Sequence, residues 1–136
     1  MALTTRFTIV TPGAVKFEGD AQIVVAPGAA GDLGALPNHA PLLTTLRAGA
    51  VRATTTTAGR VEFAVDGGFM QVMPDRVIIL TDLALTRDEI NLEQARAELQ
   101  RAEQALAQKK GADDGAERRA VAWALACVEV ARRPAA

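Results

Sequence analysis

The pattern of hydrophobic and polar residues changes near residue 85 and divides the chain into two parts. In the first part, short runs of strand-forming residues are separated by turn-forming pairs such as Pro12-Gly13. Residues 61–65 alternate between large apolar residues and Glu or Ala, which predicts a strand with one buried face. Residues 77–80 are apolar throughout, which predicts a strand that is covered on both sides. The predicted strands are residues 7–10, 23–26, 42–46, 51–57, 61–65, 69–73 and 77–80.

Further turns are predicted inside this part at residues 19–20, 48–49 and 66–68. So many turns in so short a segment predict about eight to ten short strands, arranged as an antiparallel sandwich or a flattened barrel.

From residue 86 onward, apolar residues recur at helical spacing. Thr86 and Glu89 have the spacing of a capping box, which predicts the start of a first helix. Lys109 and Lys110 suit its last turn, and Gly111 is predicted to end it. Its apolar seam, typical of a helix that packs on a partner, consists of Leu92, Ala95, Leu99, Ala102 and Leu106.

A second helix is predicted to begin at another capping box, formed by Asp114 and Glu117, and to stop at Pro134. Two helices joined by a short polar turn predict an antiparallel hairpin. Trp123 and Cys127 lie four residues apart on the second helix, and we expect them to pack against the first helix or the sandwich.

The predicted fold class is therefore α+β, with an N-terminal antiparallel β-sandwich in residues 1–85 and a C-terminal two-helix hairpin in residues 86–136. The charge distribution agrees with this division. The first part carries six basic and seven acidic residues, whereas the 51 residues of the second carry nine of each.

Composition excludes several classes of function. A net charge of −1 argues against binding to duplex nucleic acid. One Cys and one His exclude a disulfide framework and the common metal sites, so no metal is expected. No apolar run approaches the roughly 20 residues that cross a bilayer, and the start MALTTRF is not a secretory signal, so we expect a soluble intracellular protein without direct membrane insertion. No nucleophile and base are paired, so the chain is not expected to be an enzyme.

One motif resembles a known family. The segment GDLGALPNHAPLL at residues 31–43, followed by LRAGAV, is similar to the GELG-x-x-PGHAPLL…PG signature of the ε subunit of F-type ATP synthases. The resemblance continues at Gly67-Gly68-Phe69 and at residues 77–82. It ends at LEQARA, residues 92–97, which is similar to that family's (I/L)-D-x-x-R-A motif. It covers nearly the whole chain.

This resemblance implies a non-catalytic subunit of the central rotor stalk. Its sandwich would grip the γ subunit and rest on the c-ring of the proton-translocating enzyme, at the cytoplasmic face of the bacterial plasma membrane. Its hairpin would be regulatory. Folded against the sandwich it would permit turnover, and extended along γ, toward the α and β subunits, it would inhibit ATP hydrolysis.

The resemblance also implies a docking site for γ and the c-ring in the motif at residues 31–43. Asn38 stands where the family usually has Gly, but Asn tolerates the left-handed conformation. Asp32 replaces a Glu and reaches less far. The alternative is that Asp32 is an ordinary turn residue and His39 a hydrogen-bonded loop residue. The implied docking residues are Asp32, Gly34, Pro37, Asn38, His39 and Pro41.

Some members of the family bind ATP weakly through the hairpin, and the matching positions here are Glu93, Arg96, Arg118 and Arg119. The alternative is that Glu93 and Arg96 form a surface ion pair at i,i+3 spacing. No phosphate-binding loop of the G-x-x-x-x-G-K-[ST] type is present, and no other cofactor is expected. Arg118, Arg119, Arg132 and Arg133 would meet acidic segments of the β subunits in the extended state, or else form a solvated helix face.

Two glycines in the turn at residues 111–115 would cost a continuous helix about 1 kcal/mol each, so the sequence favours the folded hairpin. We therefore expect modest intrinsic inhibition. The competing hypothesis for the whole chain is a free-standing β-sandwich binding module whose hairpin is a dimerisation arm.

Overall fold

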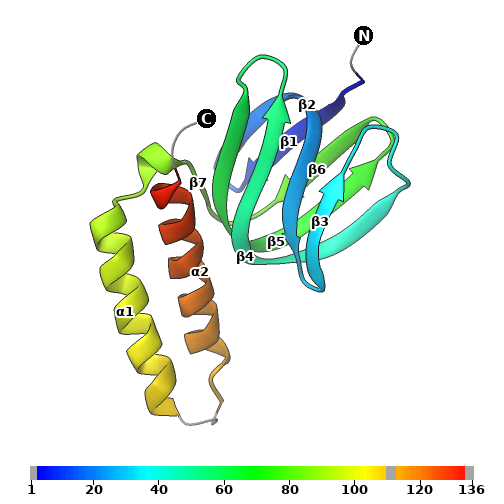
Figure 1. Ribbon diagram of the computed structural model, residues 1–136. Coiled ribbons are helices and arrows are strands. Elements are labelled where there is room, and N and C mark those ends of the chain that lie inside the picture. Colours follow the sequence, from blue (N-terminus) through cyan, green and yellow to red (C-terminus); the bar gives the residue numbers. More distant parts are fainter. Residues whose placement is uncertain (1–2, 110–112, 134–136) are drawn as a thin grey trace.

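The computed structural model describes residues 3–109 and 113–133. Seven strands form one sheet in the order β1-β6-β5-β4-β2-β3, with β7 paired to β5. Strand β1 also pairs with β2, so the pairings close into a ring and the sandwich is a flattened barrel (Figure 1). The strands are β1 (Thr5–Thr11), β2 (Ala14–Gly28), β3 (Gly31–Ala35), β4 (Leu42–Thr55), β5 (Arg60–Met73), β6 (Arg76–Leu80) and β7 (Ala84–Leu85).

The predicted fold class is confirmed, but the predicted number of strands was too high. The turns expected at residues 19–20, 48–49 and 66–68 are bends inside the long strands β2, β4 and β5. A bent strand can pass from one layer of the sandwich to the other without leaving the sheet. All pairings in the described sheet are antiparallel except that of β1 with β6, which is parallel.

The main core lies between the layers of the sandwich. Phe17 of β2 bridges Phe7 and Phe63, with ring centroids 5.6 and 5.7 Å from its own. The predicted inward face of β5 is confirmed, because Phe63 and Val65 are buried in this core and Val61 packs against it. The prediction of a single buried face was wrong, because Ala64 on the opposite face is fully buried under the second helix. The other large, fully buried side chains of this core include Ile9, Val24, Val51, Met70, Val72, Val77 and Ile79.

The C-terminal part is an antiparallel hairpin of α1 (Leu92–Lys109) and α2 (Gly115–Arg132). Helix α2 lies between α1 and the sandwich and packs against β4 and β5 (Figure 1). A second core fills this interface. Its buried members are Ala64, Ala95, Ala126, Cys127 and Val130, with Ala50, Leu85, Ile90, Trp123 and Val128 packed against them. The expected packing of Trp123 and Cys127 is therefore confirmed.

The helix starts differ from the prediction. The Thr86–Glu89 capping box forms, with the Thr86 amide donating to Glu89 Oε1 at 2.9 Å, but it caps only the short 3-10 helix η1 (Arg87–Glu89). Ile90 is extended and interrupts the helical path. Helix α1 starts at Leu92, where Asn91 Oδ1 accepts a hydrogen bond from the Gln94 amide at 3.0 Å.

The second predicted capping box was wrong. Asp114 makes no side-chain cap because its carboxylate pairs with Arg118 Nε at 2.9 Å instead. The predictions for Lys110, Gly111 and Pro134 lie outside the described residues. Neither helix, over its described residues, is long and apolar enough to cross a membrane.

Candidate functional site

The loop between β3 and β4 contains four of the six predicted docking residues, Pro37, Asn38, His39 and Pro41. Asn38 has φ 65°, the left-handed conformation predicted for it, and its amide donates to the Pro74 carbonyl at 2.8 Å. His39 Nδ1 lies 2.7 Å from the Ala40 carbonyl oxygen, and since a carbonyl can only accept, Nδ1 carries the proton. The Asn38 bond ties the loop to the β5–β6 turn, and the His39 bond holds the loop internally.

Asp32 and Gly34 lie apart from that loop, on strand β3. Asp32 Oδ1 pairs with Arg47 at 2.7 Å, so its carboxylate already has a partner within the chain. It also lines a small cavity of about 380 Å³ together with Leu125 and Ala126 of α2. The structure therefore places Asp32 beside the hairpin, and it does not bring Asp32 together with His39.

The four residues matched to nucleotide binding do not converge either. Lys109 and Glu117 lie 4.0 Å apart at the turn end of the hairpin, which sets the alignment of the two helices. Arg96 is thirteen residues before Lys109, or about 20 Å along the helix axis. Arg118 is close to the turn and is paired with Asp114. The Glu93–Arg96 ion pair, given above as the alternative to nucleotide binding, is not among those formed by the described residues.

Sequence reasoning missed an apolar surface on the outside of the sandwich. Phe69 of β5 lies opposite both Thr45 of β4 and Leu80 of β6, so all three share one face. Leu43, two residues before Thr45, lies on the same face. Leu43, Phe69 and Leu80 are 70, 52 and 50 % exposed. We call this surface, made by Leu43, Phe69 and Leu80, the outer face.

A signal for the outer face was present in the sequence. Residues 77–80 are apolar on both sides of the strand, and this pattern predicted a strand with both sides covered by other parts of the protein. In the structure Val77 and Ile79 are buried, whereas Leu80 is half exposed. In the described part of this chain, no segment therefore covers Leu80 on the outer side of the strand.

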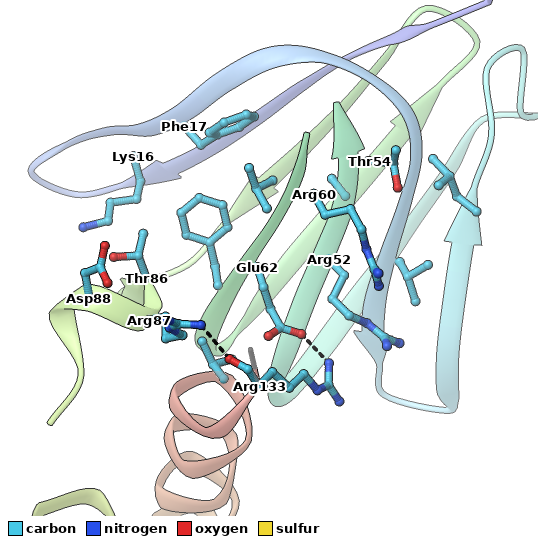
Figure 2. A pocket seen from close by; sticks show the side chains of 16 residues that line it. Lys16, Phe17, Arg52, Thr54, Arg60, Glu62, Thr86, Arg87, Asp88 and Arg133 are labelled. Carbon is cyan, nitrogen blue, oxygen red and sulfur yellow. Dashed lines mark hydrogen bonds and ion pairs between the residues drawn. The ribbon is translucent and has the colours of Figure 1, made fainter. Parts of the chain in front are cut away.

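Sequence reasoning also missed a cavity of about 870 Å³ between the sandwich and the C-terminal end of α2 (Figure 2). Glu62 of β5 forms an ion pair with Arg133, and Arg87 donates a hydrogen bond to the Arg133 carbonyl oxygen at 2.9 Å. These contacts hold the end of α2 against the sheet. Arg52 and Arg60 also line the cavity, and their guanidinium groups point to the same side of it as that of Arg133 (Figure 2).

A second ion pair lies beside this cavity. Lys16 Nζ is 2.6 Å from Glu89 Oε2. The hydrogen bond from Lys16, together with that from the Thr86 amide, lowers the pKa of Glu89 to about 2. The pair ties strand β2 to η1, the segment that leads into the hairpin.

Neither the cysteine thiol nor a group of metal ligands gives the described residues a reactive site. Burial raises the pKa of the Cys127 thiol to about 11, so the thiol stays protonated and unreactive at neutral pH. Among residues 3–109 and 113–133, no three His, Cys, Asp or Glu side chains gather as metal ligands would.

Residues 4–87 match the ATP synthase Delta/Epsilon chain beta-sandwich domain family. The chain is similar to the ATP synthase epsilon chain of Desulforamulus reducens, 48 % identical over 110 residues, or 80 % of this chain and 82 % of that protein. It is 38 % identical to the ATP synthase epsilon chain of Desulfitobacterium hafniense strain Y51 over 97 % of this chain and 99 % of that protein.

The fold is similar to that of a chain in the Euglena gracilis mitochondrial ATP synthase OSCP/F1/c-ring structure. The TM-score is 0.73 at 21 % identity, over 93 % of this chain and 78 % of that chain. A chain of the Tetrahymena thermophila mitochondrial ATP synthase central stalk/c-ring structure has a TM-score of 0.61 at 18 % identity, over 94 and 93 % of the two chains. At these identities the likeness concerns the fold alone.

Proposed function

The chain belongs to the epsilon chains of ATP synthase, which are non-catalytic subunits, and from this premise we propose that it transmits rotation from the c-ring to the γ subunit. It is accordingly part of a membrane-associated complex. In the proposal, residues 1–85 dock on γ and the c-ring, and residues 86–136 regulate ATP hydrolysis, all at the cytoplasmic face of the membrane.

The observation that supports docking best is the outer face. Three large apolar side chains exposed together on a paired sheet are unusual for a surface that faces only water. The sheet fixes their positions, so a partner that covers them loses little conformational entropy in the protein. A rotor joint needs this kind of rigid contact. We therefore assign γ to the outer face.

The loop at residues 36–41 supports a second contact, with the c-ring. It is held by backbone hydrogen bonds, it lies at the edge of the sandwich, and it presents the polar side chains of His39 and Asn38 beside the exposed Leu36. Asp32, which lies beside the hairpin, and Gly34, which pairs with Val25 on strand β2, remain predicted docking residues without a contact of this kind.

The test of γ docking is co-expression with a matching γ subunit, followed by recovery of the complex. Phe69→Glu and Leu43→Glu place a charge on the outer face at positions that are already exposed, so the sandwich should still fold. The matched control is Leu125→Glu, because Leu125 is 43 % exposed but lies on α2. Wild type and the control should recover γ, and the two outer-face variants should not.

Two results would count against this assignment. Equal recovery of γ by all variants would place the interface elsewhere on the chain. If folded wild type never recovered γ, the rotor proposal would fail, and the free-standing module with a dimerisation hairpin would take its place.

The hairpin is proposed to inhibit ATP hydrolysis when it leaves the sandwich and extends toward the α and β subunits. Val130, Ala126 and Cys127 are buried in the folded arrangement, and extension would expose them unless γ covers them. We therefore expect modest inhibition, and truncation after Arg87 should raise the ATPase activity of the assembled enzyme only slightly. A large rise would contradict this. Weak ATP binding through Glu93, Arg96, Arg118 and Arg119 would require an arrangement other than the folded hairpin described above.

A further inference from the structure

The cavity between the sandwich and α2 gathers arginines from distant parts of the sequence (Figure 2). On the sheet, Arg52 of β4 lies opposite Glu62 of β5, and Thr54 lies opposite Arg60. Arg52 and Arg60 are therefore diagonal neighbours on one face, roughly 7–8 Å apart, within reach of long side chains. The sheet register alone brings these two cations together.

The hairpin supplies the third cation. Arg133 pairs with Glu62, the neighbour of both sheet arginines, and its backbone carbonyl accepts a hydrogen bond from Arg87. The position of Arg133 is thus set from two sides. The cavity therefore joins charged groups of the sheet to the end of α2.

The positive charge around the cavity is not balanced. Five basic side chains line it, against the carboxylates of Glu62 and Asp88, and one of the five, Lys16, is paired with Glu89 beside the cavity. In the described part of the chain, Glu62 pairs with Arg133, and neither Arg52 nor Arg60 has an ion-pair partner. Glu129 lies near Arg52 and Arg133 in the smaller cavity, and it likewise takes part in none of these ion pairs.

This arrangement specifies the chemistry of a ligand. Three guanidinium groups near the carboxylates of Glu62 and Glu129 leave an excess of one positive charge, which an oxyanion would neutralise. The planar fork of a guanidinium matches the oxygen atoms of a phosphoryl group with two parallel hydrogen bonds. Ile23, Val25 and Val130 supply apolar walls that strengthen such charge interactions by lowering the local dielectric constant.

We propose that this cavity binds a phosphoryl oxyanion, held by Arg52 and Arg60 of the sheet and by Arg133, the residue that follows α2. The site is separate from the residues matched to nucleotide binding on the hairpin, and it does not depend on docking to γ. Because its ligands come from both the sheet and α2, the bound anion stabilises the packing of the hairpin on the sandwich.

The test uses the full chain and its single tryptophan. Trp123 packs in the second core, so its fluorescence reports the position of α2. Inorganic phosphate, pyrophosphate and ATP are titrated separately at constant ionic strength, with chloride as the balancing anion, and the melting temperature is measured alongside. Arg52→Gln and Arg60→Gln remove the sheet arginines, and Arg101→Gln, on the exposed side of α1, is the matched control.

We expect phosphate and pyrophosphate to give saturable changes and to raise the melting temperature, with pyrophosphate acting at lower concentration. Arg52→Gln and Arg60→Gln should each weaken binding by about tenfold or more, and Arg101→Gln should not. Circular dichroism verifies folding, and Arg60→Gln, at an exposed position, keeps the test valid if Arg52→Gln does not fold.

Three outcomes would overturn the proposal. The first is the absence of any saturable response to phosphate or pyrophosphate. The second is an equal response in all variants, which would indicate general screening by salt. The third is binding of ATP alone that survives Arg60→Gln but is lost in Arg96→Gln, which would place the anion on the hairpin instead.

Discussion

Gly68 of β5 is a position where a single methyl group should damage the sandwich. Its φ of 119° lies outside the conformations that L side chains readily adopt. A Cβ atom there would lie 2.1 Å from the Leu80 carbonyl oxygen, and real Cβ atoms essentially never approach within 3.0 Å. Gly68→Ala therefore requires strand β5 or β6 to move by about 1 Å.

Two other glycines allow the effects of backbone strain and of steric overlap on stability to be measured separately. At Gly13 no heavy atom lies within 4 Å of the added Cβ and φ is not positive, so Gly13→Ala should be neutral or stabilise by about 0.4–1 kcal/mol. Gly59 has φ 66° but open space, so Gly59→Ala should cost about 1–2 kcal/mol. Gly68→Ala combines backbone strain with overpacking and should cost about 2–6 kcal/mol.

The assay is equilibrium unfolding in urea, followed by circular dichroism, on the wild type and the three variants. The free energy of unfolding should fall in the order Gly13→Ala, Gly59→Ala, Gly68→Ala. If Gly68→Ala loses no more stability than Gly59→Ala, the Leu80 carbonyl moves aside at little energetic cost, and the predicted steric penalty at Gly68 is wrong.

Three further predictions concern the attachment of the hairpin. The contacts of Glu89 lower its pKa to about 2, so Glu89→Gln should lower the free energy of unfolding at pH 7. The difference from wild type should shrink as the pH falls from about 4.5 to about 2. A difference that does not depend on pH would exclude the Lys16 contact as its cause. Val130 is fully buried against the sheet, so Val130→Ala should lower the free energy of unfolding by about 1.5–3 kcal/mol and alter Trp123 fluorescence; unchanged stability would mean that α2 is not packed there. Cys127 should react slowly with iodoacetamide at pH 8 and rapidly in urea, whereas equal rates would show that α2 is open in the native protein.

The fold class followed from local signals because turn residues and apolar periodicity act over short stretches of sequence. Two kinds of detail did not follow. A Gly-containing bend inside a strand has the same composition as a turn between strands, so β4 and β5 were each divided in two. The Thr86–Glu89 capping box formed, but Ile90 continued in an extended conformation and the main helix began later.

The position of α2 could not be read from alternation alone. Ala64 occupies a polar-side position of β5, yet it is fully buried because α2 covers that face. Its cross-strand neighbour is Ala50, and the small size of both residues allows α2 to approach closely. Alanine at an exposed strand position is ordinary, so it gave no signal of a helix above it.

The residues of the candidate sites could be predicted only where they lie close together in the sequence. Asn38 could be placed in a left-handed turn because it stands in a short motif where the similar family usually has Gly, and Asn tolerates that conformation. Arg52, Arg60 and Arg133 come from two strands and the far end of the chain. Their meeting depends on sheet register and on the docking of α2, neither of which a linear pattern specifies.

Strands β4 and β5 pair along almost their whole lengths, from Leu42 opposite Val72 to Thr54 opposite Arg60. One end of this two-stranded ribbon carries Leu43 and Phe69, and the other carries Arg52 and Glu62. The two ends are joined by covalent bonds and by a ladder of paired residues that is interrupted at Arg47 and Gly67, with no loop between them. In the proposed rotor joint, a twisting force applied by γ at the first end would be transmitted elastically to the second, where the hairpin is attached. The mechanical load on the subunit and the proposed release of its helices would then share one stiff element.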